Sequence, residues 1–154
     1  MALTHVDEAA RDAIERACTR LVLASIRAFD DRDFLAYADL FTPDGVFIRA
    51  NQPQEPLSGR AAILSALASR PPGRITRHLC TNIEVEVIDV SRARGRCYLL
   101  LYAADMAAQE TELGRQSEGP QRIGEYHDEF VQTGGGWRIA RRVGCLIFHT
   151  AAAP

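Results

Sequence analysis

The chain has 154 residues, of which 47% are hydrophobic and 25% are charged, with a formal net charge of −2. This composition predicts one globular domain over residues 1–154, with its core in residues 10–149. The charge excludes a strongly basic nucleic-acid-binding surface, and no apolar run reaches the ~18 residues of a membrane-spanning helix. All 18 basic residues are arginine, which we attribute to codon usage and not to binding.

The N-terminal segment MALTHVDEAARD is acidic and lacks the features of a secretory signal peptide, so we expect a cytoplasmic protein. The four cysteines, at positions 18, 80, 97 and 145, have neither the spacing of a zinc site nor that of a CxxC redox motif. We therefore expect reduced thiols, with no metal and no other cofactor.

The first part of the chain has the pattern of helices. Apolar residues recur at steps of three and four over residues 10–28, which predicts a helix that starts at a capping box in residues 4–7, with Thr4 as its cap, and ends near Asp30. A short second helix is expected in DDRDFLAYADLF, where Asp31 or Asp33 can act as the cap.

Residues 42–45, with the sequence TPDG, are expected to form a turn, since Pro fixes φ and Gly permits positive φ. A short strand, VFIRA, and a proline-containing loop, NQPQEPL, are predicted to follow. The segment GRAAILSALASR is predicted to form a third helix, capped by Ser58 and ended by the sequence PPG.

The second half has the pattern of strands. Long strands are predicted over residues 74–90, 96–106, 122–132 and 137–149, with a loop or frayed hairpin arm over residues 107–121. Three helices followed by strands with local connections predict an α+β fold with a mostly antiparallel sheet covered by helices on one face.

The strand RITRHLCTNIEVEV raises a question of side-chain direction. Strict alternation places His78, Cys80 and Asn82 on one face and the aliphatic residues on the other, although Asn is disfavoured in strands. In the last strand the same alternation places Ile139 and Arg141 on one face. A β-bulge would reverse this assignment partway along either strand.

Three segments carry a resemblance to a known family: RAFDDRDFLAYADLFTPDGVF, TRHLCTNIEVEV and GEYHDEFVQTGGGWRIARR. With the order of elements, they resemble the SnoaL-like branch of the nuclear transport factor 2-like superfamily, whose members include dehydratases, dehydrochlorinases and polyketide cyclases. The resemblance implies a cone-like α+β barrel, in which three N-terminal helices pack on a curved, mostly antiparallel sheet.

In the dehydratase and dehydrochlorinase members, an aspartate at the end of the first helix pairs with a strand histidine, and Asp30 and His78 stand at these positions. The resemblance therefore implies a catalytic dyad in which the carboxylate fixes the imidazole tautomer and the second ring nitrogen transfers a proton. The other pocket groups differ. Phe29 stands where the dehydratase has tyrosine, Tyr126 where it has asparagine, and Gln132 near the pocket arginine of the dehydrochlorinase.

Further candidate site residues are aromatic or acidic. Tyr126 can donate a hydrogen bond to a substrate carbonyl or developing enolate, or can be a plain core residue. Asp128, on the same strand face, can bind substrate or pair with Arg138 or Arg142. The candidate walls of the substrate pocket are Phe29, Tyr37, Phe41, Phe47, Tyr98 and Phe148.

Two other groupings do not predict a site. Cys80 lies about 7 Å from His78 by strand rise, too far for a nucleophilic Cys–His pair, so a buried thiol is expected. Glu125, His127 and Glu129 lie along one strand, an arrangement that suits a metal ion poorly. We expect this face to be solvated or to contact another copy in a homodimer or homotrimer.

The leading hypothesis is a cofactor-independent lyase or isomerase of the dehydratase or cyclase type. It would act on a small hydrophobic, cyclic carbonyl or hydroxyl compound by His–Asp general acid/base catalysis. The alternatives are a non-catalytic ligand-binding module, or a small structural subunit like the β subunit of ring-hydroxylating dioxygenases. No nucleic-acid or membrane partner is expected.

Overall fold

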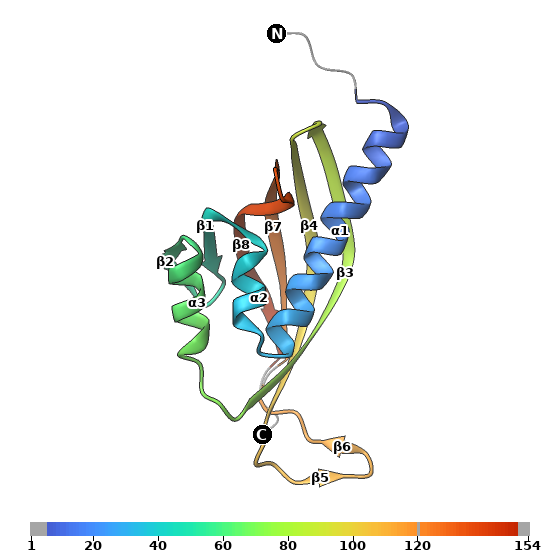
Figure 1. The fold of residues 1–154 in the computed structure, drawn as a ribbon. Helices are drawn as coiled ribbons and strands as arrows, with labels where there is room; N and C mark the ends of the chain where they lie inside the picture. Colours follow the sequence, from blue (N-terminus) through green and yellow to red (C-terminus); the bar gives the residue numbers. More distant parts are fainter. Residues whose placement is uncertain (1–5, 120, 151–154) are drawn as a thin grey trace.

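A computed structural model describes residues 6–119 and 121–150 of the chain. Three helices cover one face of a curved sheet (Figure 1). The helices are α1 (Glu8–Asp30), α2 (Phe34–Asp39) and α3 (Arg60–Ala68). The strands of the main sheet are β1 (Phe41–Arg49), β2 (Gln52–Ser58), β3 (Arg74–Asp89), β4 (Arg92–Asp105), β7 (Arg122–Thr133) and β8 (Gly136–His149).

The sheet has the strand order β2-β1-β8-β7-β4-β3. The β1–β8 pair is parallel and the other pairs are antiparallel. Within the described residues the edge strands β2 and β3 do not pair with each other, so the sheet curves without closing into a barrel. The predicted α+β class, with three helices on a mostly antiparallel sheet, is confirmed.

Helix α1 presents an apolar stripe to the sheet, and its first turn is capped by Asp7, whose carboxylate accepts a hydrogen bond from the Ala10 amide at 2.8 Å. The predicted cap, Thr4, lies outside the described residues. The buried residues of the stripe recur at helical spacing, as the sequence predicts; they are Ile14, Cys18, Leu21, Val22, Ser25 and Ala28.

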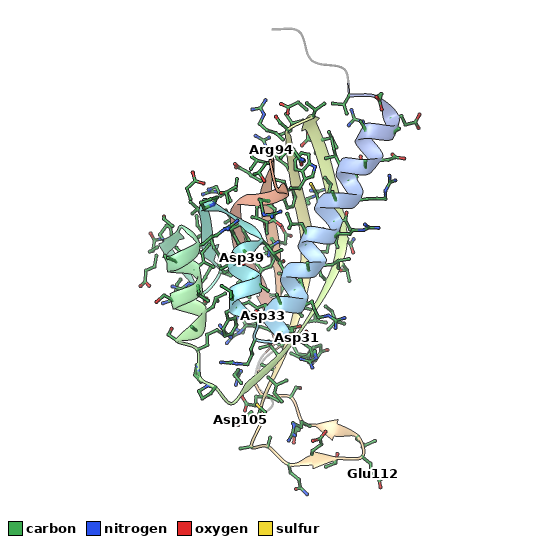
Figure 2. The ribbon with its side chains drawn as sticks, in the orientation of Figure 1. Asp31, Asp33, Asp39, Arg94, Asp105 and Glu112 are labelled. Carbon is green, nitrogen blue, oxygen red and sulfur yellow. The ribbon has the colours of Figure 1, made fainter. Side chains whose placement is uncertain are left out.

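A tight turn joins α1 to α2 at the end where Asp31 and Asp33 are labelled (Figure 2). Asp33 is the cap of α2 and accepts from the Ala36 amide at 3.0 Å. Arg32, at φ 60°, donates through its guanidinium to the backbone oxygens of Arg70 and Arg74 at 3.2 and 3.4 Å. The turn is thereby tied to the start of β3.

Three local predictions in residues 42–58 are wrong. The expected turn at residues 42–45 lies within β1, where the pairing with β8 shifts register. The expected loop NQPQEPL forms most of β2, which tolerates its prolines because it lies at the edge of the sheet. Ser58 ends β2, while Gly59 at φ 85° is the N-cap of α3 and makes no side-chain capping bond.

Strand β3 contains a bulge at Asn82, which has φ 51°, and its pairing with β4 shifts between Thr81 and Glu84. Before the bulge the even-numbered residues, including His78, face the helices. After it the odd-numbered residues, ending at the buried Val87, face them. The predicted strict alternation is therefore wrong, because the extra residue exchanges the two faces.

A second bulge interrupts β8. The pairing with β7 shifts between Glu129, opposite Arg141, and Phe130, opposite Ile139. Ile139 and Arg142 are both fully buried, whereas Arg141 is exposed. The predicted shared face of Ile139 and Arg141 is thus wrong, and the bulge turns Arg142 into the core.

Strands β5 (Glu110–Thr111) and β6 (Gly114–Arg115) form a hairpin that projects from the end of the sheet, with Asp105 near its base and Glu112 near its tip (Figure 2). It corresponds to the predicted hairpin arm. Its return segment is attached by the Glu118 amide, which donates to the Ala103 oxygen at 2.7 Å. None of the helices in the described residues is long and apolar enough to cross a membrane.

Candidate active site

The C-terminal end of α1 brings Asp30 against β3, where its carboxylate accepts three hydrogen bonds. His78 Nδ1 lies 2.6 Å from Oδ1, the His78 amide donates to Oδ2 at 2.8 Å, and the Thr76 hydroxyl donates to Oδ1 at 2.9 Å. The side chains of Asp30 and His78 are each 9% exposed. The structure therefore brings together the two residues of the predicted dyad, which lie 48 positions apart in the sequence.

The surroundings keep the Asp30 carboxylate ionised. Burial on its own raises the pKa of Asp30, but the hydrogen bonds and charge of His78, with the bond from Thr76, outweigh burial and lower it. An ionised carboxylate on Nδ1 fixes the tautomer in which Nδ1 carries the proton, and this leaves Nε2 as the basic atom of the neutral ring.

No side chain or backbone group in the described residues hydrogen-bonds to Nε2 of His78. The imidazole instead packs edge-on against the Phe29 ring, with 5.1 Å between ring centres. An unoccupied ring nitrogen beside an aromatic surface can exchange a proton with a bound organic molecule.

Aromatic side chains from α1, α2, β1 and β7 continue this surface. Phe29 contacts Tyr37 at 5.6 Å between ring centres, Tyr37 contacts Phe47 at 5.9 Å, and Phe47 contacts Tyr126 at 6.3 Å. Phe41 packs against Tyr37 at 5.6 Å and is fully buried. Five of the aromatic residues predicted at the site thus form one continuous cluster.

Space for the Tyr126 ring depends on a glycine. A Cβ atom at Gly144 would lie 3.3 Å from Tyr126 and 3.1 Å from the backbone of Ala50, tighter than ordinary contact. Burial raises the pKa of Tyr126, so its hydroxyl keeps its proton and can act as a hydrogen-bond donor.

Beneath Tyr126, Arg142 and Asp128 form a buried ion pair with two hydrogen bonds of 2.7 Å, and Arg142 also donates to Ser25 of α1 at 2.7 Å. The guanidinium lies 4.3 Å from the Tyr126 ring centre. Burial would lower the pKa of Arg142, but the charge of Asp128 outweighs it and raises the pKa. Both carboxylate oxygens of Asp128 therefore accept hydrogen bonds from Arg142, and through Arg142 the ion pair joins α1 to β7 and β8.

Two of the predicted pocket residues lie elsewhere. Tyr98 and Phe148, which are 48% and 65% exposed, lie on the sheet face opposite the helices. The structure does not bring them to the dyad. Cys80 follows His78 on the inner face, and all four cysteines are free of disulfide bonds.

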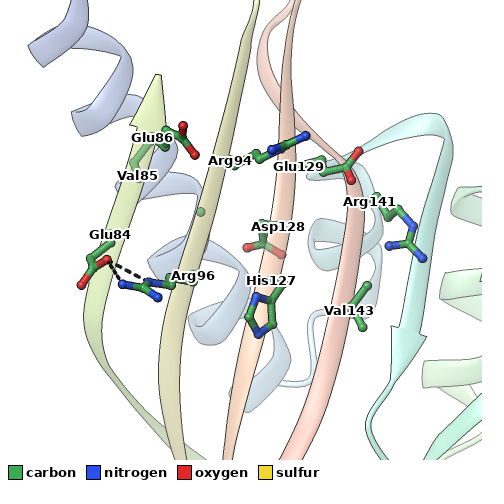
Figure 3. Close-up of a pocket in the computed structure, with 11 residues that line it drawn as sticks. Glu84, Val85, Glu86, Arg94, Arg96, His127, Asp128, Glu129, Arg141 and Val143 are labelled. Carbon is green, nitrogen blue, oxygen red and sulfur yellow. Dashed lines mark hydrogen bonds and ion pairs between the residues drawn. The ribbon is translucent and has the colours of Figure 1, made fainter. Parts of the chain in front are cut away.

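The outer face of the sheet carries a hollow of about 430 Å³, seen in Figure 3 with the helices behind the strands. It is lined by charged groups that include Arg96, paired with Glu84 at 2.6 Å. The nearby Glu125 and His127 side chains hydrogen-bond each other at 3.0 Å. Across the described part of the chain, no three His, Cys, Asp or Glu side chains gather as a metal site.

A smaller hollow, of about 90 Å³, lies beside the dyad. It is lined by Thr76, Leu101, Ala103 and Gly119, by the arginines Arg70, Arg74 and Arg122, and by Glu118, which pairs with Arg74. Neither Thr76 nor these arginines were predicted from the sequence to lie beside the dyad. Thr76 could have been found, because it precedes His78 by two positions and so shares its strand face.

Three helices on a curved, mostly antiparallel sheet are the fold of the nuclear transport factor 2-like class of α+β proteins. Residues 10–143 match the SnoaL-like domain, and the chain belongs to this family. No curated protein matches the chain. The predicted resemblance is confirmed.

Several solved structures share the fold. A putative scytalone dehydratase from Novosphingobium aromaticivorans has a TM-score of 0.79 and 21% identity, covering 96% of this chain and 93% of its own. A type 2 hexachlorocyclohexane dehydrochlorinase (LinA) has a TM-score of 0.76 and 19% identity, covering 96% and 98%. ActVI-ORFA from Streptomyces coelicolor has a TM-score of 0.69 and 18% identity, covering 87% and 97%.

Proposed function

We propose that the protein is a cofactor-independent lyase or isomerase in which His78 transfers a proton and Asp30 orients it. The observation that carries this proposal is the 2.6 Å contact between Asp30 and His78 Nδ1, in a ring that packs against Phe29 and whose Nε2 has no partner in the described residues. The similar structures named as a dehydratase and a dehydrochlorinase support elimination as the reaction type.

In this mechanism Nε2 removes a proton from a carbon beside a carbonyl or a leaving group. The electron pair of the broken C–H bond forms a new double bond, and the ionised Asp30 stabilises the imidazolium that results. His78 then returns the proton to the departing oxygen or to another carbon, which completes an elimination or a double-bond shift. Tyr126 donates a hydrogen bond to the substrate oxygen as negative charge develops there.

The aromatic cluster from Phe29 to Tyr126 supports a small, hydrophobic, cyclic substrate, because flat rings pack well against aromatic faces. With the acid/base role assigned to protein side chains, the proposed reaction uses no cofactor.

Exchange of carbon-bound protons tests this proposal without knowledge of the product. A panel of cyclic ketones and hydroxy ketones in D₂O would be followed by NMR for loss of the α-proton signals. We expect the wild-type protein to accelerate exchange of at least one compound, and His78→Ala and Asp30→Asn each to reduce the rate by about 10²–10⁴-fold.

The control is His127→Ala, since His127 lies on the outer face of the sheet and should keep the wild-type rate (Figure 3). Circular dichroism would verify that each variant is folded. Full exchange activity in both dyad variants would refute the proposal. Ligand binding without exchange by the wild type would favour the binding module.

We also propose that the outer face of the sheet contacts another copy of the chain. Apolar side chains gather there at one end, with the exposed residues Leu79, Tyr98, Ile123 and Phe148. At the other end, four adjacent strands carry alternating charges in register, namely Glu86, Arg94, Glu129 and Arg141. Alternation of this kind supports self-association, because a copy in the opposite orientation can set each acid against a base.

A further inference from the structure

Arg70, the second residue after α3, places a positive charge over the ring of Phe29, at the edge of the aromatic cluster. Its guanidinium carbon lies 4.9 Å from the centre of the Phe29 ring, and the His78 ring centre lies 5.1 Å from the same point. A molecule bound along Phe29 therefore has a proton-transfer group and a cation within reach.

Arg70 forms no ion pair with an acidic side chain of the described residues, although Glu118 lines the same hollow. No acidic side chain in the described residues lies within 4 Å of it, whereas the neighbouring Arg74 is paired with Glu118. Partial burial lowers the pKa of Arg70, and the nearby positive charges of Arg32 and Arg74 lower it further. A half-buried cation among other cations attracts an anion strongly, because solvent screens it incompletely.

Arg49, whose charge lowers the pKa of Arg70 less than the charges of Arg32 and Arg74 do, has an incompletely bonded guanidinium. It ends β1, two positions after the core residue Phe47. Its Nε atom is buried with no hydrogen-bond partner in the described residues, and its NH2 atom is 3.6 Å from Glu55. Buried polar atoms are rarely left unpaired in proteins.

The hollow lined by Arg70, Arg74 and Thr76 offers room for the partner. Its volume of about 90 Å³ corresponds to a few water molecules at ~30 Å³ each, so it accommodates a small polar group and not a second ring. The Thr76 hydroxyl in its lining donates to Asp30, so this hollow directly adjoins the dyad.

We propose that Arg70 binds a carboxylate group of the molecule on which His78 acts. The planar guanidinium donates two parallel hydrogen bonds to a carboxylate, which fixes orientation as well as charge. The substrate is then a cyclic organic acid, with its ring against Phe29 and its reacting carbon at His78 Nε2. The role of His78 in this assignment rests on the proposed function; the carboxylate site itself does not.

The test is a binding measurement with benzoate and with benzamide, which has nearly the same shape but no charge. Affinities would be measured by NMR titration for the wild type, Arg70→Gln and Arg49→Gln. We expect the wild type to bind benzoate more tightly than benzamide, and Arg70→Gln to weaken benzoate binding at least about tenfold. Arg49→Gln should weaken it by a smaller factor.

Arg96→Gln is the matched control, because Arg96 lies on the outer face and pairs with Glu84 there; it should leave benzoate affinity unchanged. His78→Ala should also retain benzoate binding, so a loss of proton transfer and a loss of acid recognition remain distinguishable. Equal affinities for benzoate and benzamide would overturn the proposal. So would an unaffected Arg70→Gln variant, wild-type benzoate binding weaker than about 10 mM, or Arg70-dependent binding of inorganic phosphate without binding of benzoate.

Discussion

Three aspartates within four residues, Asp30, Asp31 and Asp33, have different environments. Asp30 accepts hydrogen bonds from Thr76 and His78, and Asp33 caps α2. Asp31 is exposed, and its backbone amide bonds the end of α1. The side chains differ in what they contact because a helix end and a tight turn point successive residues in different directions. Only Asp30 is directed at the sheet.

Replacement of Asp30 by Asn should make the free energy of unfolding less dependent on pH in the acidic range. The pKa of Asp30 is lowered below 3.8 in the folded protein, so its carboxylate stabilises the fold above that pH, and this stabilisation is lost as the pH falls through the folded-state pKa. We expect Asp30→Asn to lower the free energy of unfolding by about 2 kcal/mol at pH 7, the scale of hydrogen bonds to a charged group.

Urea unfolding at a series of pH values would check this, and the difference from wild type should shrink below pH 3.8. The neighbouring variant Asp31→Asn should change the free energy of unfolding by no more than about 0.5 kcal/mol, as is usual at exposed positions. A pH-independent difference for Asp30→Asn would contradict the assignment.

At the scale of elements, β3 carries both His78 of the dyad and the core residue Val87, and the bulge at Asn82 lies between them. The bulge at Asn82 lets His78 and Val87 face the same side of the sheet, although strict alternation would put them on opposite sides. Asn is suited to the position because its short polar side chain tolerates positive φ better than most residues do. Asparagine is unfavourable in a regular strand, but at this bulge it stabilises the conformation better than most residues would.

Substitution of Asn82 tests the role of this backbone conformation. Asn82→Gly should leave the free energy of unfolding within about 1 kcal/mol of wild type, whereas Asn82→Val should lower it by about 1–2 kcal/mol, because a β-branched side chain is strained at φ 51°. Denaturant unfolding would measure both. Thr81→Val, at the preceding exposed position, serves as control, and a fully stable Asn82→Val variant would show that φ at this residue does not matter.

The whole molecule has two unlike sheet faces. The inner face, under α1 and α2, holds the dyad and the aromatic cluster, while the outer face carries the hollow of Figure 3 and exposed apolar side chains. Exposed apolar side chains that gather on one face can mark an interface. We propose that the two faces have different partners, a small molecule inside and another copy of the chain outside.

The interface proposal predicts a loss of self-association when a charge is placed on the outer apolar surface. Sedimentation of the wild type at micromolar concentration should show a dimer or trimer, and Tyr98→Asp or Phe148→Asp should shift it toward monomer. Leu35→Asp, at a residue that is 60% exposed on α2, should leave assembly unchanged. A wild-type protein that remains monomeric at the highest soluble concentration would refute the interface.

Much of this architecture is predictable from the sequence, and the failures share a cause. Helical periodicity identifies α1, and alternating strands identify β3, β4, β7 and β8, since these patterns are local. The errors at β2 and at the bulges occur where non-local pairing overrides local preference. Prolines that suggest a loop are accommodated at a sheet edge, and the pairing of β8 with β7 turns Arg142 inward to meet Asp128.

The sequence by itself determined the helices, the long strands and, through family resemblance, the candidate pair Asp30 and His78. Only the tertiary structure decided which face each strand residue occupies, because one extra residue in a bulge reverses all later side chains. It also decided that Tyr98 and Phe148 lie outside and that Arg70 packs on Phe29 beside His78. Arg70 acquires its proposed role because folding packs it on Phe29, the ring that also contacts His78.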